Sequence, residues 1–170
     1  MKLKLVFLSL VFMSALAFSQ SQTCNCCTEN HDDFDFWIGE WSVKNSNNGT
    51  PAGTSKIEKI EGECVVKENW TSASAGYTGT SFNFYNQKTK QWEQLWLDNQ
   101  GASLHLKGNR IENQMILKSD KEKNAQGQLF YHQITWTKNE DGTVQQKWET
   151  FTEGQDVVVA FDGLYSKKEG

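Results

Sequence analysis

Short segments in which apolar and polar residues alternate recur about every ten to fifteen residues along the chain. A period of two is typical of β-strands, and no stretch keeps a helical period over three turns. Clusters of Gly, Asn and Asp lie between the segments, and these residues tolerate the dihedral angles of turns. The pattern predicts ten strands, at residues 40–44, 55–61, 64–72, 80–85, 91–98, 102–108, 114–119, 129–138, 143–152 and 157–166.

The short connections predict that each strand pairs with the next strand along the chain. An open meander of this length has exposed edges, and about ten strands can close around a lumen of ligand size. The predicted fold class is therefore all-β, a single up-and-down antiparallel β-barrel of about ten strands. The segment 30–38 is expected to cap the closed end as a short helix or turn.

An aromatic cluster precedes the first strand, in the run Phe34-Asp35-Phe36-Trp37-Ile38-Gly39-Glu40-Trp41. Phe36, Gly39 and Trp41 resemble the opening motif of the calycins, the lipocalins and fatty-acid-binding proteins among them. In that family an aromatic-rich turn and Gly-x-Trp lie at the closed end of an up-and-down barrel. Together with the later segment 91–99, the phrase is similar to a group of secreted bacterial β-barrel proteins. The resemblance spans residues from about 34 to 165 and implies a calycin-like fold without implying an activity.

The first 19 residues have the pattern of a secretory signal peptide. Lys2 and Lys4 precede an apolar run, which ends in the small-x-small sequence Ala17-Phe18-Ser19. We therefore expect a signal peptide at 1–19, a Cys-containing segment at 20–33 and the barrel domain at 34–170. No later stretch is apolar enough to span a membrane, so the protein is expected to be secreted or periplasmic.

The charge of the chain argues against a nucleic-acid partner. The formal net charge is −4, and loss of Lys2 and Lys4 with the signal peptide lowers it to −6. An acidic surface repels a phosphate backbone. The expected partner is a small molecule or an oligosaccharide, and the oligomeric state is left open.

All four cysteines, Cys24, Cys26, Cys27 and Cys64, lie in the first part of the chain. In an oxidising compartment we expect disulfides, with Cys64 paired to Cys26 or Cys27. The alternatives are free thiols or a metal site made by the first three cysteines and His31. Adjacent Cys26 and Cys27 are poorly spaced to chelate one ion, so no metal is expected.

The hairpin at 91–108 brings candidate ligand-binding residues together. A four-residue loop at 98–101 would pair Trp96 with Ser103, Gln94 with His105, and Trp92 with Lys107. That register predicts one aromatic and hydrogen-bonding face. The other face would carry the leucines Leu95, Leu97, Leu104 and Leu106.

The hairpin at 129–152 offers candidate catalytic residues. A four-residue loop at 139–142 would pair His132 with Glu149, and Trp136 with Gln145. A carboxylate beside an imidazole fixes its tautomer and raises its pKa, which prepares it as a base. The opposite face of this hairpin carries Tyr131, Gln133 and Trp148.

These residues favour a secreted barrel that binds a polar ring-shaped ligand such as an oligosaccharide. Indole faces would cover the C–H surface of a sugar, and amides and hydroxyls would bind its hydroxyl groups. The predicted ligand-binding residues are Trp92, Gln94, Trp96, Ser103, Lys107, Arg110, Gln133, Trp136 and Trp148.

The chemistry that such a site would most naturally perform is elimination, as in a metal-independent lyase or dehydratase that needs no cofactor. The predicted catalytic residues are His132, His105, Tyr131 and Glu149, with Lys107 and Arg110 stabilising the negative charge that develops. Haem ligation by His105 or His132 is a weaker alternative, because a single His in a strand has no spacing signature.

A non-catalytic carrier or sensor of a lipophilic ligand is the alternative function, and an interaction module is a third. The residues that face the lumen distinguish a lipophilic carrier from a site for a polar ligand. Leu95, Leu97, Leu104 and Leu106 would line a carrier, whereas Trp92, Gln94, Trp96 and His105 would line a polar site.

Overall fold

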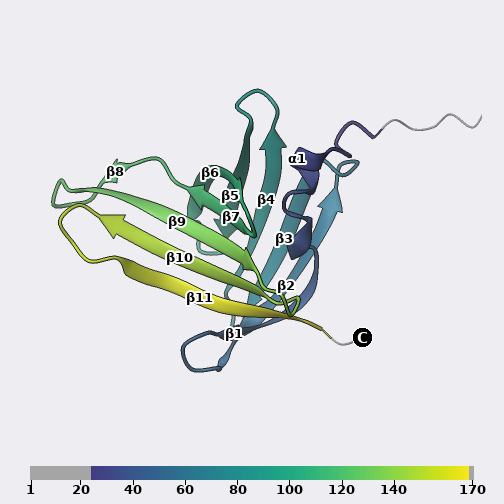
Figure 1. Ribbon diagram of the computed structural model, residues 1–170. Helices are drawn as coiled ribbons and strands as arrows, with labels where there is room; N and C mark the ends of the chain where they lie inside the picture. Colours follow the sequence, from purple (N-terminus) through teal and green to yellow (C-terminus); the bar gives the residue numbers. More distant parts are fainter. Residues whose placement is uncertain (1–23, 169–170) are drawn as a thin grey trace, which may run out of the picture.

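The computed structural model describes residues 24–168, which form a β-barrel with a short helical segment at its N-terminal end (Figure 1). The predicted signal peptide at 1–19 lies outside the described residues. The strands are β1 Gly39–Asn45, β2 Pro51–Ile60, β3 Val65–Ser72, β4 Thr78–Asn86, β5 Gln91–Asp98, β6 Ser103–Ile111, β7 Gln114–Lys118, β8 Glu122–Lys123, β9 Leu129–Lys138, β10 Val144–Thr152 and β11 Val158–Lys167.

Ten of these strands close into an up-and-down antiparallel barrel. Neighbours in the chain pair with one another, except that β7 pairs with β9, and β11 pairs with β1 to close the ring. The two-residue strand β8 adds to the edge of β9 and was not predicted. The predicted all-β, up-and-down antiparallel barrel of about ten strands is therefore confirmed, with each predicted strand within a few residues of its observed bounds.

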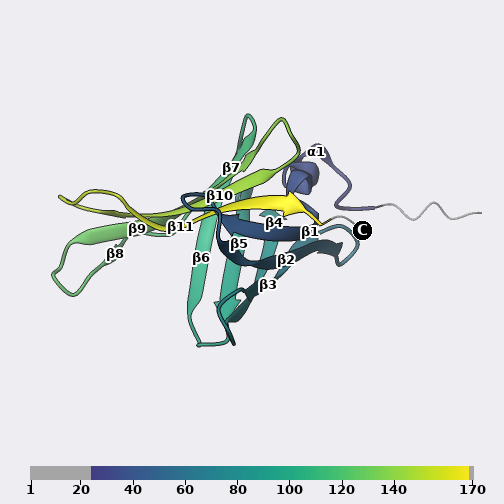
Figure 2. The same cartoon turned by 90° about the horizontal axis from the view of Figure 1, so that it is seen from below.

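One end of the barrel is closed by the N-terminal segment. Helix α1 (Glu29–Asp32) and the 3-10 turn η1 (Asp35–Trp37) lie over this end, and Phe34 between them is fully buried. The Phe34 ring stacks on Trp37 at 5.0 Å and meets Trp136 edge-on at 5.1 Å. The expected cap is confirmed. In Figures 1 and 2 it lies at the right, while the tips of the β8–β9 and β10–β11 connections lie at the left.

Gly39 is required where the cap enters β1. Its φ of 139° is a backbone conformation that side-chain-bearing residues rarely adopt. A Cβ atom at this position would also collide with Lys167 Nζ. The Lys167 ammonium donates to Ile38 O at 2.6 Å and lies 4.4 Å from the centre of the Trp41 ring. The last strand is thereby fixed to the Gly-x-Trp motif.

The N-terminal segment carries two disulfides, one of which fastens it to the barrel. Cys26 is bonded to Cys64, which confirms one of the two predicted pairings, and Cys24 is bonded to Cys27, which was not predicted. Because all four sulfur atoms are paired, none is free to bind a metal as the alternative interpretation required. His31 is buried and forms a hydrogen bond to Thr28 Oγ1 at 2.7 Å.

Both predicted hairpin registers are wrong by one residue, for the same physical reason. Asp98 N–H donates to Ala102 O at 3.1 Å, and Asn139 N–H donates to Thr143 O at 2.9 Å. The loops between these pairs contain three residues rather than four. Gly101 (φ 87°) and Gly142 (φ 81°) take the left-handed position that such loops place before the second strand.

In the observed registers, one strand of each hairpin is shifted by one residue relative to the predicted pairing. Gln94 lies opposite Leu106 instead of His105, and His132 lies opposite Thr150 instead of Glu149. A shift of one residue moves a side chain to the other face of a sheet. His105 and Glu149 therefore face outward.

Within residues 24–168, no helix combines the length and the hydrophobicity needed to cross a bilayer.

Candidate ligand-binding cavity

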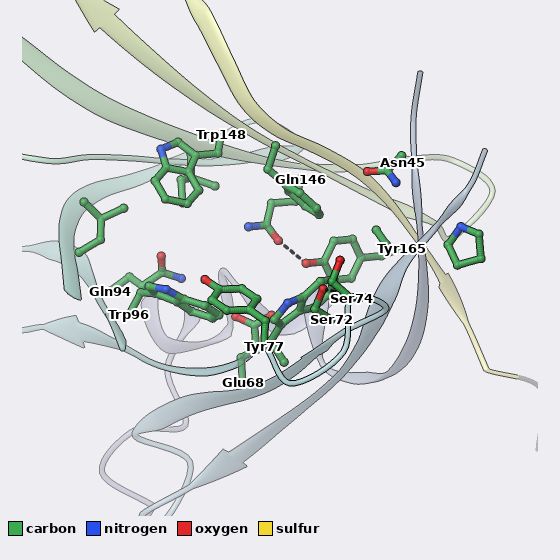
Figure 3. Close-up of a pocket in the computed structure, with 16 residues that line it drawn as sticks. Asn45, Glu68, Ser72, Ser74, Tyr77, Gln94, Trp96, Gln146, Trp148 and Tyr165 are labelled. Atoms are coloured by element: carbon green, nitrogen blue, oxygen red, sulfur yellow. Dashed lines mark hydrogen bonds between the residues drawn. The ribbon is translucent and has the colours of Figure 1, made fainter. Parts of the chain in front are cut away.

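A cavity of about 290 Å³ lies inside the barrel, on the side of the lumen away from the aromatic cap (Figure 3). Strands and loops from most of the barrel contribute to its wall. Figure 3 shows Gln146 and Trp148 on one side, with Gln94, Trp96 and Glu68 opposite. The lining residues are Asn45, Pro51, Ala52, Glu68, Trp70, Ser72, Ser74, Tyr77, Gln94, Trp96, Leu104, Ile134, Gln146, Trp148, Phe161 and Tyr165.

Two glycines let tryptophan rings lie flat against the wall of the cavity. A Cβ atom on Gly53 would lie 2.7 Å from the Trp70 ring, and one on Gly79 would collide with the Trp96 ring. The indoles therefore occupy space that a side chain on the neighbouring strand would fill. This arrangement leaves room in the lumen beside the rings.

Glu68 is the only carboxylic acid among the described residues that line the cavity. It lies on β3 and is only 3% exposed. Ser55 Oγ donates to Oε1 at 2.8 Å, and Ser81 Oγ donates to Oε2 at 3.0 Å. Each carboxyl oxygen thus has one hydroxyl partner from a neighbouring strand.

Burial raises the pKa of Glu68 from 4.5 to about 7, because a charged carboxylate loses its hydration inside the barrel. The two serine hydroxyls oppose this effect but do not cancel it. Glu68 consequently exists in both protonation states near neutral pH. A carboxyl group in this range can act as a proton donor or as a proton acceptor.

A chain of buried side chains directs its donors toward Glu68. Gln94 Nε2 donates to Asn83 Oδ1 at 2.7 Å, and Asn83 Nδ2 donates to Ser81 Oγ at 3.0 Å. Ser81 in turn donates to Glu68. Asn83 also donates to Val66 O at 2.9 Å, which fixes its amide. Aligned hydrogen bonds polarise one another, so the chain stabilises negative charge on Glu68.

Two tyrosines complete the polar part of the cavity. Tyr165 is buried, and its hydroxyl donates to Gln146 Oε1. Burial, together with the nearby Glu68 carboxyl, raises the pKa of Tyr165 well above its ordinary value, so the phenol stays protonated. Tyr77, in the β3–β4 connection, donates to Asp98 Oδ2 at 3.1 Å and so joins this connection to the end of β5.

His132 holds one wall of the cavity without lining it. Trp148 Nε1 donates to His132 Nδ1 at 3.1 Å, and Thr150 Oγ1 lies 3.0 Å from the same nitrogen. Burial lowers the pKa of His132, which favours the neutral ring that accepts this bond. His132 is therefore a positioning residue for Trp148.

The structure brings only part of the predicted ligand-binding set into the lumen. Gln94, Trp96 and Trp148 line the cavity. Trp92 and Trp136 point inward but are fully buried in the core beneath it. The remaining predicted ligand-binding residues lie on the outside of the sheet or at the capped end, and these are Ser103, Lys107, Arg110 and Gln133.

Arg110 lies beside the cap. Its Nε donates to Glu112 O at 2.9 Å, and its guanidinium carbon is 5.7 Å from the centre of the Phe36 ring. Lys107 Nζ lies 3.6 Å from Asp120 Oδ2 on the outer surface. Neither cation reaches the cavity, so the predicted clamp for an anionic ligand is not assembled there.

The four predicted catalytic residues are dispersed. His105 pairs with Glu93 at 3.0 Å on the outer face, and Glu149 pairs with Lys147 at 2.8 Å. Tyr131 stacks on Phe151 at 4.9 Å on the outer face of β9 and β10. Only His132 points inward, where it contacts Trp148.

Several cavity residues were missed by the sequence analysis. They are Glu68, Trp70, Tyr77, Gln146 and Tyr165. Glu68 left a recognisable signal, since it shares its strand face with the apolar residues Val66 and Trp70. An acid between two apolar positions of period two is a candidate for burial.

Comparison with known proteins does not add to this description, because no protein-family model matches the chain and the search of curated proteins gave no match.

Proposed function

We propose that this protein binds a small, polar, ring-shaped ligand in the cavity of its barrel. The single observation that carries this proposal is a buried carboxyl group and three amides in a cavity walled by aromatic rings. Aromatic faces pack against the flat face of a ring, and a few polar groups select its substituents. The inward positions of Trp96 and Gln94 support this function.

The size of the cavity supports a ligand of one ring. An apolar cavity of about 150 Å³ holds benzene. The volume of about 290 Å³ therefore accommodates one ring with its substituents, such as a single sugar unit. A saccharide ligand agrees with the mixture of aromatic and hydrogen-bonding groups.

A carrier of a purely lipophilic ligand receives less support. Leu104 lines the cavity, and Leu106 lies in the core, but Leu95 and Leu97 are exposed. An apolar ligand would offer no partner to the donors and acceptors of Glu68, Gln94 and Gln146 that their internal hydrogen bonds leave unused. Unpaired buried polar groups cost about 1–3 kcal/mol each.

Tryptophan fluorescence tests the binding proposal, because Trp70, Trp96 and Trp148 line the cavity. A titration with monosaccharides and polar aromatic compounds is expected to give a saturable change. Trp96→Leu should lower the affinity at least tenfold, whereas Tyr131→Leu on the outer face should leave it unchanged. Absence of a saturable change with every compound, or equal losses in both variants, would contradict the proposal.

An elimination reaction is a second candidate function, with Glu68 as the base in place of the predicted histidine. Ionised Glu68 would take the proton from a ring carbon that lies next to a carbonyl group. The same proton then passes from Glu68 to the hydroxyl group on the adjacent carbon, which leaves as water as the carbon–carbon double bond forms. The pKa of about 7 favours this role because both forms are populated at neutral pH. A neutral or cationic ring suits the site better than a uronic acid, since Lys107 and Arg110 lie elsewhere.

Mass spectrometry of a ligand incubated with the protein would show the loss of one water. Glu68→Gln is expected to abolish that loss while retaining binding. If bound ligands keep their mass with the wild-type protein, the barrel acts as a binding protein only.

We also propose that the protein is exported. The two disulfides support an oxidising compartment, since cytosolic thiols are kept reduced. Fractionation of the native host, with detection by an antibody, would locate the protein.

A further inference from the structure

Within residues 24–168, the lining of the cavity carries a negatively charged group but no positively charged one. Among the described residues that line it, Glu68 supplies the only acid, and none is Lys, Arg or His. The hydrogen-bond donors to its carboxyl are the neutral hydroxyls of Ser55 and Ser81. A buried carboxylate is costly unless a positive charge pairs with it. The lining residues supply no such charge.

Acceptor capacity remains on the Glu68 carboxyl group. An ionised carboxylate can accept about four hydrogen bonds, and the two serines provide one to each oxygen. Because Glu68 lines the cavity, a ligand in the lumen can supply further donors. The donors of the Gln94–Asn83–Ser81 chain all run toward Glu68, which also prepares the site for negative charge.

The walls of the same cavity attract cations. Six aromatic residues line it, namely Trp70, Tyr77, Trp96, Trp148, Phe161 and Tyr165. The negative face of an aromatic ring attracts a cation, and Trp is the most favourable of the aromatic side chains. In Figure 3 the Trp148 and Trp96 rings lie on opposite sides of the cavity. A carboxylate and several π faces around one small space form a receptor for an ammonium group.

We propose that the cavity selects ring compounds that carry a protonated amino group, and that Glu68 pairs with this group. The inference rests on the proposed function and deepens it by naming the ligand class. A neutral hydroxyl could donate to Glu68 but would leave its charge unbalanced, and an anion would be repelled. Amino sugars and arylalkylamines, in which a methylene group separates the amino group from the aromatic ring, share the required chemistry.

Isothermal titration calorimetry with two matched pairs of probes tests the proposal and separates these two sources. The pairs are glucosamine with glucose, and benzylamine with benzyl alcohol. At least one amine is expected to bind the wild-type protein at least tenfold more tightly than its hydroxyl counterpart. The pair that shows the preference identifies the ring type.

Glu68→Gln should bring the affinities of each pair within about twofold of one another. The control variant Glu149→Gln makes the same change on the outer face, where Glu149 pairs with Lys147, and should retain the preference. Should Glu68→Gln fail to fold, the comparison of probes on the wild-type protein still decides the question.

The outcomes distinguish this inference from the function on which it rests. If the hydroxyl compounds bind as tightly as the amines, the ammonium selectivity is wrong and the cavity remains a site for polar rings. If none of the four probes binds, and the wider fluorescence panel is also negative, both proposals fail.

Discussion

Glu68 is an acid in a position where neighbouring residues on the same strand face are apolar. Val66 and Trp70 flank it on the inner face of β3, and its carboxyl contacts two serine hydroxyls rather than a cation. Ionising a group in such surroundings lowers the stability of the fold. Ionised Glu68 therefore lowers the stability of the unliganded fold, and a bound ligand that pairs with the carboxylate could restore it.

The pH dependence of stability should reveal this cost. Between pH 4.5 and about 7 the folded protein holds a proton on Glu68 that the unfolded chain has released. The free energy of unfolding therefore falls as the pH rises through this window, by about 3 kcal/mol from this group. Urea denaturation of the wild-type protein and Glu68→Gln at several pH values measures the difference. If the difference in free energy of unfolding between the two proteins stays constant with pH, Glu68 does not have a raised pKa in the folded protein.

His132 offers a second test at the residue scale. Removal of its ring in His132→Ala leaves Trp148 Nε1 without its acceptor, so the indole should lose its fixed orientation. We expect ligand affinity to fall about threefold to tenfold, in line with one lost hydrogen bond of about 1 kcal/mol. Fluorescence titration measures the affinity, and His105→Ala on the outer face is the matched control. Complete loss of a chemical activity with unchanged affinity would instead support the predicted catalytic role of His132.

At the scale of the strands, a missing side chain on β4 positions a ring on β5. Gly79→Ala places a methyl group where the Trp96 ring lies, with Leu97 O also close at 3.0 Å. The ring must then move into the lumen. We expect a loss of stability of about 1–3 kcal/mol, as for other overpacked sites, together with weaker ligand binding.

Thermal denaturation and Trp fluorescence of Gly79→Ala would show both effects. Thr80→Ala changes the adjacent residue on the same strand and should alter neither the spectrum nor the affinity. Unchanged fluorescence in Gly79→Ala would mean that the wall does not depend on this close contact.

The strands were predictable from sequence because alternation and turn residues are local signals. The side-chain partners across the hairpins were not, because the choice between three and four loop residues depends on where the left-handed glycine falls. Gly101 and Gly142 each follow an Asp- or Asn-containing turn that allows both readings. Because of that single ambiguity, the prediction put His105 on the same face as Gln94 and paired His132 with Glu149.

For the whole molecule, the N-terminal cap and the barrel form one unit through Cys26 and Cys64. This bond joins residues 38 positions apart, whereas Cys24–Cys27 joins residues three positions apart. The entropy lost by the unfolded chain grows with loop length, so the longer loop is worth about 4 kcal/mol and the shorter at most about 2 kcal/mol.

Replacement of both cysteines in each pair by alanine tests this order. The Cys26→Ala, Cys64→Ala protein should unfold at markedly lower urea concentration than the Cys24→Ala, Cys27→Ala protein. Equal midpoints would show that the aromatic contacts of Phe34 and Trp37 hold the cap without the longer crosslink.

The candidate site was only partly predictable, because it is assembled from residues far apart in the chain. Gln94, Trp96 and Trp148 could be chosen from their hairpins, but Glu68 and Tyr165 meet only after the barrel closes. No local pattern links strands β3 and β11. The chemistry of the lumen therefore depends on closure of the barrel. The strand pattern implies that the barrel closes, but it does not show which residues then meet.

The aromatic plug around Phe34 and Trp37 makes the lumen a blind pocket rather than a tunnel. A guest must leave by the opening through which it arrived, and nothing can thread through the barrel. If the ligand is part of a polymer, only the terminal unit of the polymer can enter the cavity. The number of sites that the protein can bind would then equal the number of chain ends. Affinity per unit mass should then fall as the polymer lengthens.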